Sequence, residues 1–583
     1  MAGSRRALVV VAVVFAAFFG LPGVVAVQPA GAQTIQVASA TPSEADQGTF
    51  SLPVTIKGSG FKKGAKAKFY VAGTGDPGGI TVSSTRFIDS TQLVATIDVA
   101  STATVSGFDI EVVNADGRTG KGTELFKVLE KVDPCTAVPE PAGGYGISDV
   151  PGLPGYLDGT FGNGVGRVIG PRHMEVAFAY GRGVAIDGAG RIVVTGLWYD
   201  PCAPKGSYEL AVARYLSDGS LDSSFGLAGD GLVRIAFGGG TGSTGGGRTI
   251  LLQPDGKIVI VGEGMPARRS NPMPVVVRLT QSGQLDTSFG TNGITWISPG
   301  TGYWGGYFNS ATLQSDGKIV AAGMVMVTSV GQTRRGFIAR LKSDGTLDTS
   351  FGSMGGMYVS APPTTEFYAA GIGPEGRVVV TGYSDNTLSQ GIGTIWRFTN
   401  SGTLDSAFGN AGVATIPSTY DADDFDCLDF TIDSAGYIVT TCSFGPYYRG
   451  RVGLVRYDPF GNLDVAFGNA GIALAPVEAG LASGRGVNIQ GDGKIVVSGD
   501  LMVPDGAGGY AYSAGVWRFL ADGSPDPAFG AGGRVFDPIA SETGFLLSGG
   551  LAIQPDGKIL WAGWVTRTGK TRVSYAALAR FWQ

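Results

Sequence analysis

The feature that most constrains this chain is a unit of about 60 residues that occurs seven times between residues 155 and 583. The phrase Leu-Asp-x-x-Phe-Gly marks each copy, with Pro in place of Leu in the last, and its Phe recurs every 57 to 64 residues. A second phrase, seen at 252–262, contains a turn glycine. These glycines are Gly190, Gly256, Gly317, Gly376, Gly436, Gly493 and Gly557. A unit of this length buries its apolar faces only by stacking on its neighbours.

Each copy contains four segments with strand patterning. Strand a precedes the turn glycine, strand b follows it, strand c carries a repeated Arg, and strand d follows the Phe-Gly pair. Strand b is apolar on both faces, as in 258–261, which is typical of a strand buried between stacked sheets. Seven four-stranded units predict an all-β fold, a closed seven-bladed β-propeller over residues 155–583. A β-helix would need shorter coils, and a helical solenoid would need helices.

The repeated phrases resemble the delta-60 repeat of exported bacterial proteins and, more loosely, the NHL-type propeller repeat. The resemblance covers residues 155–583 and recurs in all seven copies. It implies a propeller fold but no settled activity.

The spacing between strands distinguishes two faces of the predicted propeller. Six residues separate the turn glycine from the end of strand b in every copy, and eight separate the Arg of strand c from the following Asp. The b–c gap varies from 14 to 19 residues and the d–a gap from 24 to 30. Because strands alternate in direction, the b–c and d–a loops share one face. We expect a binding site on this variable face, since loops on a rigid scaffold carry function.

The constant Arg-to-Asp spacing indicates a structural ion pair in each unit. A three-residue loop at 217–219 would place Arg214 opposite Asp222, with Gly219 supplying the left-handed residue. Such a cross-strand pair stabilises by roughly 0.2–1 kcal/mol, and it leaves these Asp residues poorly suited to bind metal. The expected pairs are Arg214 with Asp222, Arg278 with Asp286, Arg340 with Asp348, Arg397 with Asp405, Arg456 with Asp464, Arg518 with Asp526, and Arg580 with Asp158. The last pair would close the ring and remove its exposed edges.

A separate domain is predicted before the repeats, at residues 33–130. Short strands separated by Gly, Asp and Ser clusters suggest an immunoglobulin-like sandwich. The residues at 41–42, 54–61, 114–117 and 125–128 resemble the IPT/TIG family, which implies a spacer or protein-contact module. Residues 131–154 are rich in Pro and Gly and are predicted to be a linker.

Residues 1–32 have the pattern of a secretory signal peptide. Arg5 and Arg6 precede an apolar run that is too short to span a bilayer, and 30–32 read Ala-Gly-Ala. Arg5-Arg6 also resembles a twin-arginine signal. We expect a secreted bacterial protein, extracellular, periplasmic or at the cell surface, monomeric and not inserted in a membrane after cleavage. Cleavage lowers the net charge from −5 to −7, the opposite sign to a nucleic-acid binder.

Export makes disulfides feasible for the four cysteines. We favour Cys427 with Cys442, on two sides of one hairpin, and Cys135 with Cys202, which would join the linker to the first repeat. The alternative for Cys427 and Cys442 is a register offset of one residue that would leave both thiols free.

The chain contains little that points to catalysis, and no catalytic residue is assigned. His173 is the only histidine, which excludes a His-ligated zinc cluster. An acidic run in the fifth d–a loop could bind calcium through oxygen ligands, although a solvated loop is the simpler interpretation. Its members are Asp421, Asp423, Asp424 and Asp426. No other cofactor is expected.

Aromatic side chains and Arg in the variable loops suggest a surface for a sugar or a protein, although packing of the loops would also explain them. The candidates are Trp198, Tyr199, Tyr303, Trp304, Tyr307, Tyr447, Tyr448, Arg449, Tyr510 and Tyr512. The leading hypothesis is a non-catalytic binding or scaffold protein for a glycan or a protein. A calcium- or carboxylate-dependent hydrolase or lyase, and a purely structural role, are the alternatives.

Overall fold

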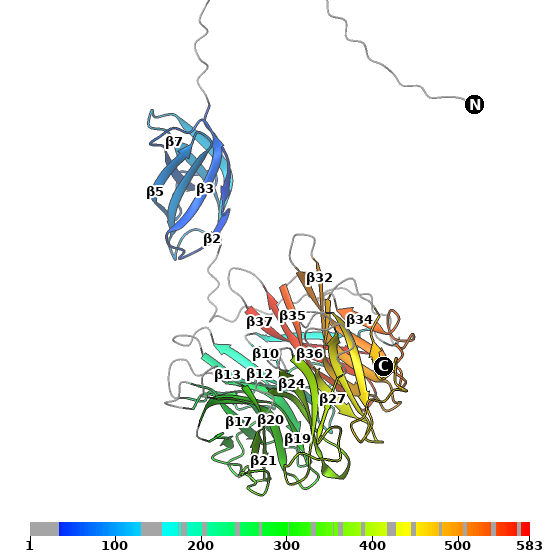
Figure 1. The fold of residues 1–583 in the computed structure, drawn as a ribbon. Helices are drawn as coiled ribbons and strands as arrows, with labels where there is room; N and C mark the ends of the chain where they lie inside the picture. Colours follow the sequence, from blue (N-terminus) through cyan, green and yellow to red (C-terminus); the bar gives the residue numbers. More distant parts are fainter. Residues whose placement is uncertain are drawn as a thin grey trace, which may run out of the picture. The chain divides into compact units, whose positions relative to one another are not determined.

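The computed structural model describes residues 34–129, 154, 156–172, 174–176, 183–200, 207–238, 245–266, 271–300, 302–327, 334–353, 355–358, 365–385, 391–416, 427–444, 450–476, 481–504, 510–537, 544–567 and 573–583. These residues form an all-β protein that divides into two compact units (Figure 1), one within residues 1–138 and the other within 139–583. One 3-10 turn, η1 (Pro374–Gly376), accompanies the strands. None of the described helices is long and apolar enough to cross a membrane.

The first unit contains two four-stranded sheets around one apolar core. Their strand orders are β1-β3-β6-β5 and β2-β8-β7-β4, with β2 parallel to β8. Strand β6 alternates buried and half-buried residues along its length, as expected where one face packs on a core. The strands are β1 (Gln36–Thr41), β2 (Glu44–Asp46), β3 (Leu52–Ser59), β4 (Lys66–Val71), β5 (Ile80–Asp89), β6 (Gln92–Val99), β7 (Gly107–Val113) and β8 (Thr119–Leu129).

Asn114 links two motifs of the first unit that are far apart in the sequence, the Asn-x-x-Gly turn at 114–117 and the loop that follows β3. Its side chain is buried, accepts a hydrogen bond from the Lys62 backbone amide at 3.0 Å and donates to the Gly60 carbonyl at 2.8 Å. The Asn-x-x-Gly turn therefore holds the loop after β3 in place. Gly60 has a φ of +78°, a conformation that glycine adopts at little cost.

The second unit contains seven antiparallel sheets among the described residues, numbered here in chain order. Sheet 1 contains β10 (Met174–Val176), β11 (Val184–Ile186), β12 (Ile192–Asp200), β13 (Ser207–Tyr215) and β14 (Leu232–Ile235). Sheet 2 contains β15 (Gly245–Leu252), β16 (Ile258–Gly264), β17 (Met273–Leu279) and β18 (Ile294–Trp296). Sheet 3 contains β19 (Tyr303–Leu313), β20 (Ile319–Val327), β21 (Arg334–Leu341) and β22 (Gly356–Tyr358). Sheet 4 contains β23 (Thr365–Ile372), β24 (Val378–Asp385), β25 (Gly391–Phe398) and β26 (Val413–Thr415).

The remaining three sheets follow the same order along the chain. Sheet 5 contains β27 (Cys427–Ile432), β28 (Ile438–Phe444), β29 (Arg451–Tyr457) and β30 (Ile472–Leu474). Sheet 6 contains β31 (Leu481–Ile489), β32 (Ile495–Pro504), β33 (Tyr510–Phe519) and β34 (Arg534–Asp537). Sheet 7 contains β35 (Gly544–Ile553), β36 (Ile559–Arg567) and β37 (Val573–Phe581), and its fourth strand is β9 (Arg167–Arg172), from the start of the unit.

The strands that precede the turn glycine, one from each of the seven sheets, lie against one another in a closed circuit; in sheet 1 this strand is β11, which pairs with β12 beside β10. In order these strands are β11, β15, β19, β23, β27, β31 and β35, and β35 again lies against β11. In sheets 2 to 6 the strands then follow outward in chain order. The strand before the turn glycine is therefore the innermost strand of each sheet, and the arrangement is propeller-like (Figure 1).

The repeated Arg, Asp and Phe form the same cluster in every sheet. Arg340 Nε donates to Asp348 Oδ2 at 2.9 Å, and its guanidinium lies 4.6 Å from the centre of the buried Phe351 ring. Equivalent contacts join all seven expected Arg–Asp pairs. Each Asp also accepts the backbone amide two residues later, as Asp348 does from Ser350. The Leu-Asp-x-x-Phe-Gly phrase is thus a turn that holds an ion pair over a buried ring.

The same cluster also joins each sheet to the next. Arg340 Nη1 donates to the Asn400 carbonyl at 2.7 Å, and the Gly352 amide donates to the Ser401 carbonyl at 2.7 Å. Both acceptors belong to the c–d turn of sheet 4, about one repeat further along the chain. The phrase therefore fixes the orientation of neighbouring sheets, and not only the hairpin that contains it.

A β-bulge interrupts the innermost strand of sheets 2 to 7 at one position, eight residues before the turn glycine. The bulge directs a backbone carbonyl toward the position of strand b that is glycine in six repeats. Strand b continues past this glycine, to Val327 in sheet 3 and to Asp385 in sheet 4, so the sequence placed the end of strand b too early. A Cβ added to Gly382 would lie 2.0 Å from the Glu366 carbonyl oxygen, and one added to Gly323 would lie 2.0 Å from that of Tyr307. In sheets 3 and 4 the bulge therefore leaves no room for a side chain at this glycine.

Candidate functional site

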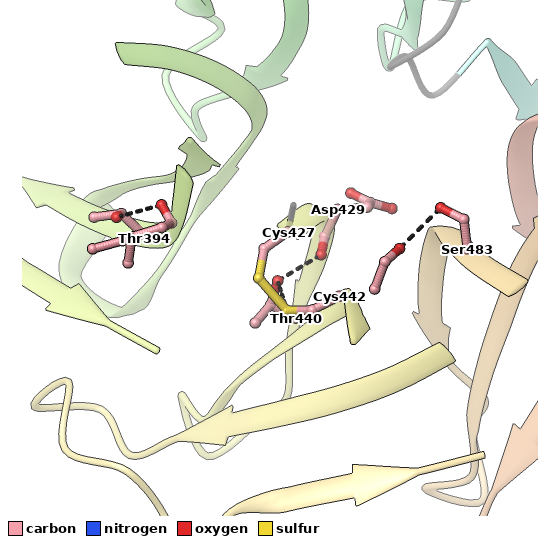
Figure 2. The surroundings of a disulfide bond; sticks show 8 residues. Thr394, Cys427, Asp429, Thr440, Cys442 and Ser483 are labelled. Carbon is pink, nitrogen blue, oxygen red and sulfur yellow. Dashed lines mark hydrogen bonds between the residues drawn. A yellow bond between two sulfur atoms is a disulfide. The ribbon is translucent and has the colours of Figure 1, made fainter. Parts of the chain in front are cut away.

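The fifth repeat has Cys442 at the glycine position, and the structure joins it to Cys427 in a disulfide (Figure 2). The bulge at Leu428 makes Cys427 the direct partner of Cys442, which removes the one-residue offset considered from the sequence. Both cysteines are buried. Cys135 and Cys202 lie outside the described residues.

The bulge position differs in side chain from sheet to sheet, and it lies on the innermost strands. Its occupants in sheets 2 to 7 are Arg248, Asn309, Tyr368, Leu428, Arg485 and Gly549. In sheets 2 to 4, polar residues at and near this position form one connected group. We call it the inner-strand network, and its members are Arg248, Glu263, Tyr307, Asn309, Arg334 and Glu366.

Arg248 holds the first half of the inner-strand network together. Its Nη1 donates to Asn309 Oδ1 at 2.8 Å, and its Nη2 lies 3.3 Å from both carboxylate oxygens of Glu263. The guanidinium also stacks 4.0 Å from the centre of the Tyr307 ring. Arg248 is 6% exposed, and its Nε has no hydrogen-bond partner among the described residues.

Glu366 holds the second half. Its Oε1 accepts from the Tyr307 hydroxyl at 2.8 Å and from Asn309 Nδ2 at 3.0 Å, while its Oε2 accepts from Arg334 Nη1 at 3.2 Å. Glu366 is buried, whereas the Arg334 side chain is 56% exposed. The network therefore runs from a partly exposed Glu263 to an exposed Arg334, through a buried middle.

The electrostatic environment of the network keeps Tyr307 protonated and both arginines positively charged. Burial, together with the charge of Glu366, raises the pKa of the Tyr307 phenol well above its usual range. Burial by itself disfavours a charged Arg248, but Glu263 and the other neighbours outweigh it and raise the pKa of this guanidinium. Both Arg248 and Arg334 are therefore cations at every physiological pH.

A second polar group occupies the equivalent place in sheets 5 and 6. Arg485 Nε donates to Asp500 Oδ2 at 2.8 Å, and these residues are 15 apart in sequence, as Arg248 and Glu263 are. The Ser443 and Ser483 hydroxyls are 2.9 Å apart (Figure 2). Asp429 is buried and accepts from the Val487 amide at 3.1 Å. The spacing of 15 thus places an ion pair between the bulge residue and the residue that follows the glycine of strand b.

Of the aromatic residues predicted to bind, the structure brings Tyr307 into the inner-strand network. Trp198 is half-buried under the Arg234 guanidinium, and Tyr199 packs against Tyr208 at a ring distance of 5.1 Å. Tyr303 packs against the apolar core between sheets 2 and 3. Trp304 is half-buried in β19, near the network in sequence.

Several other predicted residues cannot be placed. Tyr447, Tyr448, Arg449 and His173 lie outside the described residues, and so do Asp421, Asp423, Asp424 and Asp426. Tyr510 and Tyr512 belong to β33, but their side chains are not described. The part of the chain that the structure describes contains no group of three or more His, Cys, Asp or Glu able to hold a metal ion. The calcium hypothesis thus remains a prediction about the acidic run.

The sequence interpretation missed Arg248, Asn309, Glu263 and Glu366. A signal for Arg248 and Asn309 exists in the repeat, since the bulge lies a fixed eight residues before the turn glycine. Polar residues stand there in three copies, Arg248, Asn309 and Arg485, where three others have Tyr, Leu or Gly. Aligning the copies on the turn glycine would have shown polar residues in an otherwise apolar strand.

Two clefts lie on the opposite face, between neighbouring sheets. One, of about 610 Å³, is lined by the a–b turns of sheets 1 and 2, and the other, of about 640 Å³, by those of sheets 6 and 7. Their linings include the repeated Asp and Gly of the turn phrase, such as Asp255 and Gly256. Because this phrase varies little between copies, we interpret the clefts as the ordinary spacing of adjacent sheets.

A family described as a domain of unknown function (DUF5122) beta-propeller matches five segments of the chain, at residues 190–225, 253–289, 314–351, 373–408 and 490–529. Each match runs from the turn-glycine phrase to the Phe of the Phe-Gly pair. The chain is thus a β-propeller repeat protein, as the sequence predicted. No curated protein sequence matches it.

Three solved structures to which the chain is similar are distant from it. The polysaccharide lyase Uly1 is 11% identical with a TM-score of 0.38, over 69% of this chain and 90% of that one. The Hadza microbial sialidase Hz136 is 11% identical with a TM-score of 0.34, over 84% and 77% of the two chains. A glucose dehydrogenase is 11% identical with a TM-score of 0.31, over 57% and 95%. Similarities this weak carry no argument about activity.

Proposed function

We propose that this is an exported, monomeric bacterial protein that binds a glycan without cleaving it, through the inner-strand network and the variable loops around it. Glu263 lies at the end of β16, and Arg334 and Glu366 lie at the starts of β21 and β23, which is the b–c/d–a side of the sheets. Arg248, Tyr307 and Asn309 lie further along β15 and β19. It combines an aromatic ring, two cations and carboxylates within hydrogen-bonding reach of one another. Such a mixture of ring faces and polar groups suits sugars.

The proposal includes the finer architecture. The second unit is a closed seven-bladed propeller of the delta-60 type, supported by the circuit of innermost strands and by β9 pairing with β37. The first unit is an immunoglobulin-like module similar to IPT/TIG domains, supported by its two packed sheets. It would act as a spacer or contact module.

The observation that favours binding over catalysis is that Glu366 already accepts hydrogen bonds at both oxygens and that Tyr307 keeps its proton. A general acid or base needs a pKa near the working pH and a free lone pair or proton. Both oxygens of Glu366 already accept hydrogen bonds, and the raised pKa of Tyr307 keeps its proton on the phenol. The alternative, a hydrolase or lyase that depends on calcium or carboxylates, would rely on the acidic run at 421–426.

The test is incubation of the mature protein with cell-wall and extracellular polysaccharides, with and without calcium, while retention and released fragments are recorded together. We expect retention without fragments, weakened by Tyr307→Ala. The matched control is Phe460→Ala, which removes an exposed ring from the c–d turn on the other face. Fragment release would replace the proposal with the enzymatic alternative, and absence of retention on every polymer would overturn it.

A further inference from the structure

The inner-strand network contains more unused hydrogen-bond donors than acceptors. Both polar atoms of Asn309 are engaged, because its Oδ1 accepts from Arg248 and its Nδ2 donates to Glu366 and to the Phe367 carbonyl. Both oxygens of Glu366 accept hydrogen bonds as well, and Glu366 is buried. The acceptor that stays partly exposed is Glu263, at 25%, and its two oxygens already share an Arg248 amino group.

The unused donors belong to the two arginines. Arg248 has a buried Nε–H without an acceptor among the described residues. Arg334 uses one N–H for Glu366 and leaves more than half of its side chain exposed. An arginine presents five N–H donors in a planar fork that matches a carboxylate or sulfate. Arg335, the next residue of β21, adds a further positive charge.

We propose that the inner-strand network binds the anionic group of an acidic polysaccharide, a carboxylate or a sulfate ester, with Arg334 as the residue that contacts it. This inference rests on the proposed glycan-binding function and names its ligand class. Glu366 fixes Arg334 from behind, so that the exposed edge of the guanidinium faces outward from a buried partner. Arg248 fixes the neighbouring Tyr307 ring, on which the sugar would lie. An acidic protein thus recognises an acidic polymer through a local reversal of charge.

The experiment measures retention of the full mature chain on acidic polymers (polygalacturonate, alginate, hyaluronan and dextran sulfate) and on neutral polymers (cellulose, chitin and dextran). We expect retention on at least one acidic polymer and on none of the neutral ones, and weaker retention as salt is raised. Any carboxylated polymer that is retained should be released by reduction of its carboxyl groups to alcohols. Dextran sulfate against dextran distinguishes the sulfate from the carboxylate.

Two variants with opposite expected effects on binding test the site, one weakening it and one strengthening it. Arg334→Gln should weaken binding about tenfold or more, because a charge-assisted hydrogen bond is lost, while Arg334→Lys should be intermediate. Glu263→Gln should strengthen binding, because it removes a nearby negative charge and keeps a hydrogen-bond acceptor for Arg248. Arg377→Gln is the matched control, since this arginine follows the a–b turn on the other face. Thermal unfolding checks that each variant is folded.

The outcomes separate this inference from the proposed function. Equal retention on neutral and acidic polymers would overturn the anionic ligand and leave glycan binding standing. Retention on acidic polymers that neither Arg334→Gln nor Glu263→Gln changes would overturn the site. Retention on no polymer would overturn both.

Discussion

Arg580 and Asp158 are 422 residues apart in the chain, yet Arg580 Nε and Asp158 Oδ2 are 2.7 Å apart. Lys558 Nζ lies 3.2 Å from the same oxygen, and Thr160 donates to the other one. The Asp158 amide also donates to the Arg580 carbonyl, and β9 then pairs with β37. The segment at the start of the second unit therefore completes its last sheet.

Asp158→Asn should lower the free energy of unfolding by about 3 kcal/mol, because Asp158 is fully buried and its loss leaves the buried Arg580 without the carboxylate that neutralises it. The comparison is Asp464→Asn, which breaks the equivalent pair with Arg456 inside sheet 5. The Arg456 and Asp464 side chains are more exposed, at 20% and 14%, so Asp464→Asn should lower the free energy of unfolding by only about 1 kcal/mol. Urea denaturation of both variants measures the difference. Equal losses would show that the closing pair is no stronger than an internal one.

Four Asp residues of the repeated pairs have a lowered pKa and should make stability depend on acidic pH, namely Asp158, Asp222, Asp286 and Asp348. Burial by itself raises the pKa of Asp286, but hydrogen bonds from Ser288 and the charge of Arg278 outweigh it and lower the pKa to about 2. A carboxyl with a lowered folded-state pKa contributes stability that is present above its unfolded pKa of about 4 and is lost as pH falls toward 2.

We therefore expect the free energy of unfolding to fall between pH 4 and pH 2, by about 2 kcal/mol for Asp286 alone. The measurement is urea denaturation at a series of pH values from 6 to 2. Asp286→Asn should be less stable at pH 6 and should lose less between pH 4 and pH 2 than the parent protein does. Parallel pH profiles for the two proteins would contradict this role.

The sequence predicted the fold because its strongest signals were local and repeated. The eight residues between Arg214 and Asp222 define a hairpin, and a hairpin pair can be deduced from spacing alone. The bond from Arg340 to the Asn400 carbonyl could not be deduced, because its acceptor is a backbone atom in another repeat. The spacing showed which strands pair, and packing between repeats decided how the sheets meet.

The candidate site was harder to predict from the sequence, because its side chains come from different repeats. Tyr307 was selected as an aromatic residue in a variable loop, but it lies in β19 and contacts Glu366, which is 59 residues further along. Glu366 had no motif around it, and its place on the innermost strand of the next sheet brings it to Asn309. Side chains that meet across sheets leave no short-range pattern.

Reduction of the Cys427–Cys442 disulfide should require unfolding, because both cysteines are at most 1% exposed. Incubation with dithiothreitol and iodoacetamide in native buffer should leave both thiols unmodified, and addition of denaturant should allow two alkylations. Mass spectrometry of the 427–442 peptide measures this. Rapid alkylation in native buffer would contradict the buried position.

The disulfide should also stabilise sheet 5. It closes a loop with a sequence separation of 15, and the chain-entropy model gives about 3 kcal/mol for a loop of that size. Cys427→Ala combined with Cys442→Gly should therefore unfold at lower urea concentration. Glycine is the appropriate replacement at 442, because six other repeats have it there. An unchanged urea midpoint would show that the bulge alone holds this strand pair.

Gly382→Ala should be strongly destabilising, by about 3 kcal/mol. The added methyl group would lie 2.0 Å from the Glu366 carbonyl oxygen, so β23 would have to move away from β24. The φ angle of Gly382 is not in the left-handed region, so steric conflict with the bulge is the cause and backbone strain is not.

Gly188→Ala is the control, since a Cβ there meets nothing within 4 Å. Urea denaturation should show a normal midpoint for Gly188→Ala and a lowered one for Gly382→Ala. Because β23 carries Glu366, Gly382→Ala should also weaken polysaccharide retention under conditions where the variant is still folded. Full stability of Gly382→Ala would mean that the bulge in β23 does not require glycine at position 382 of β24.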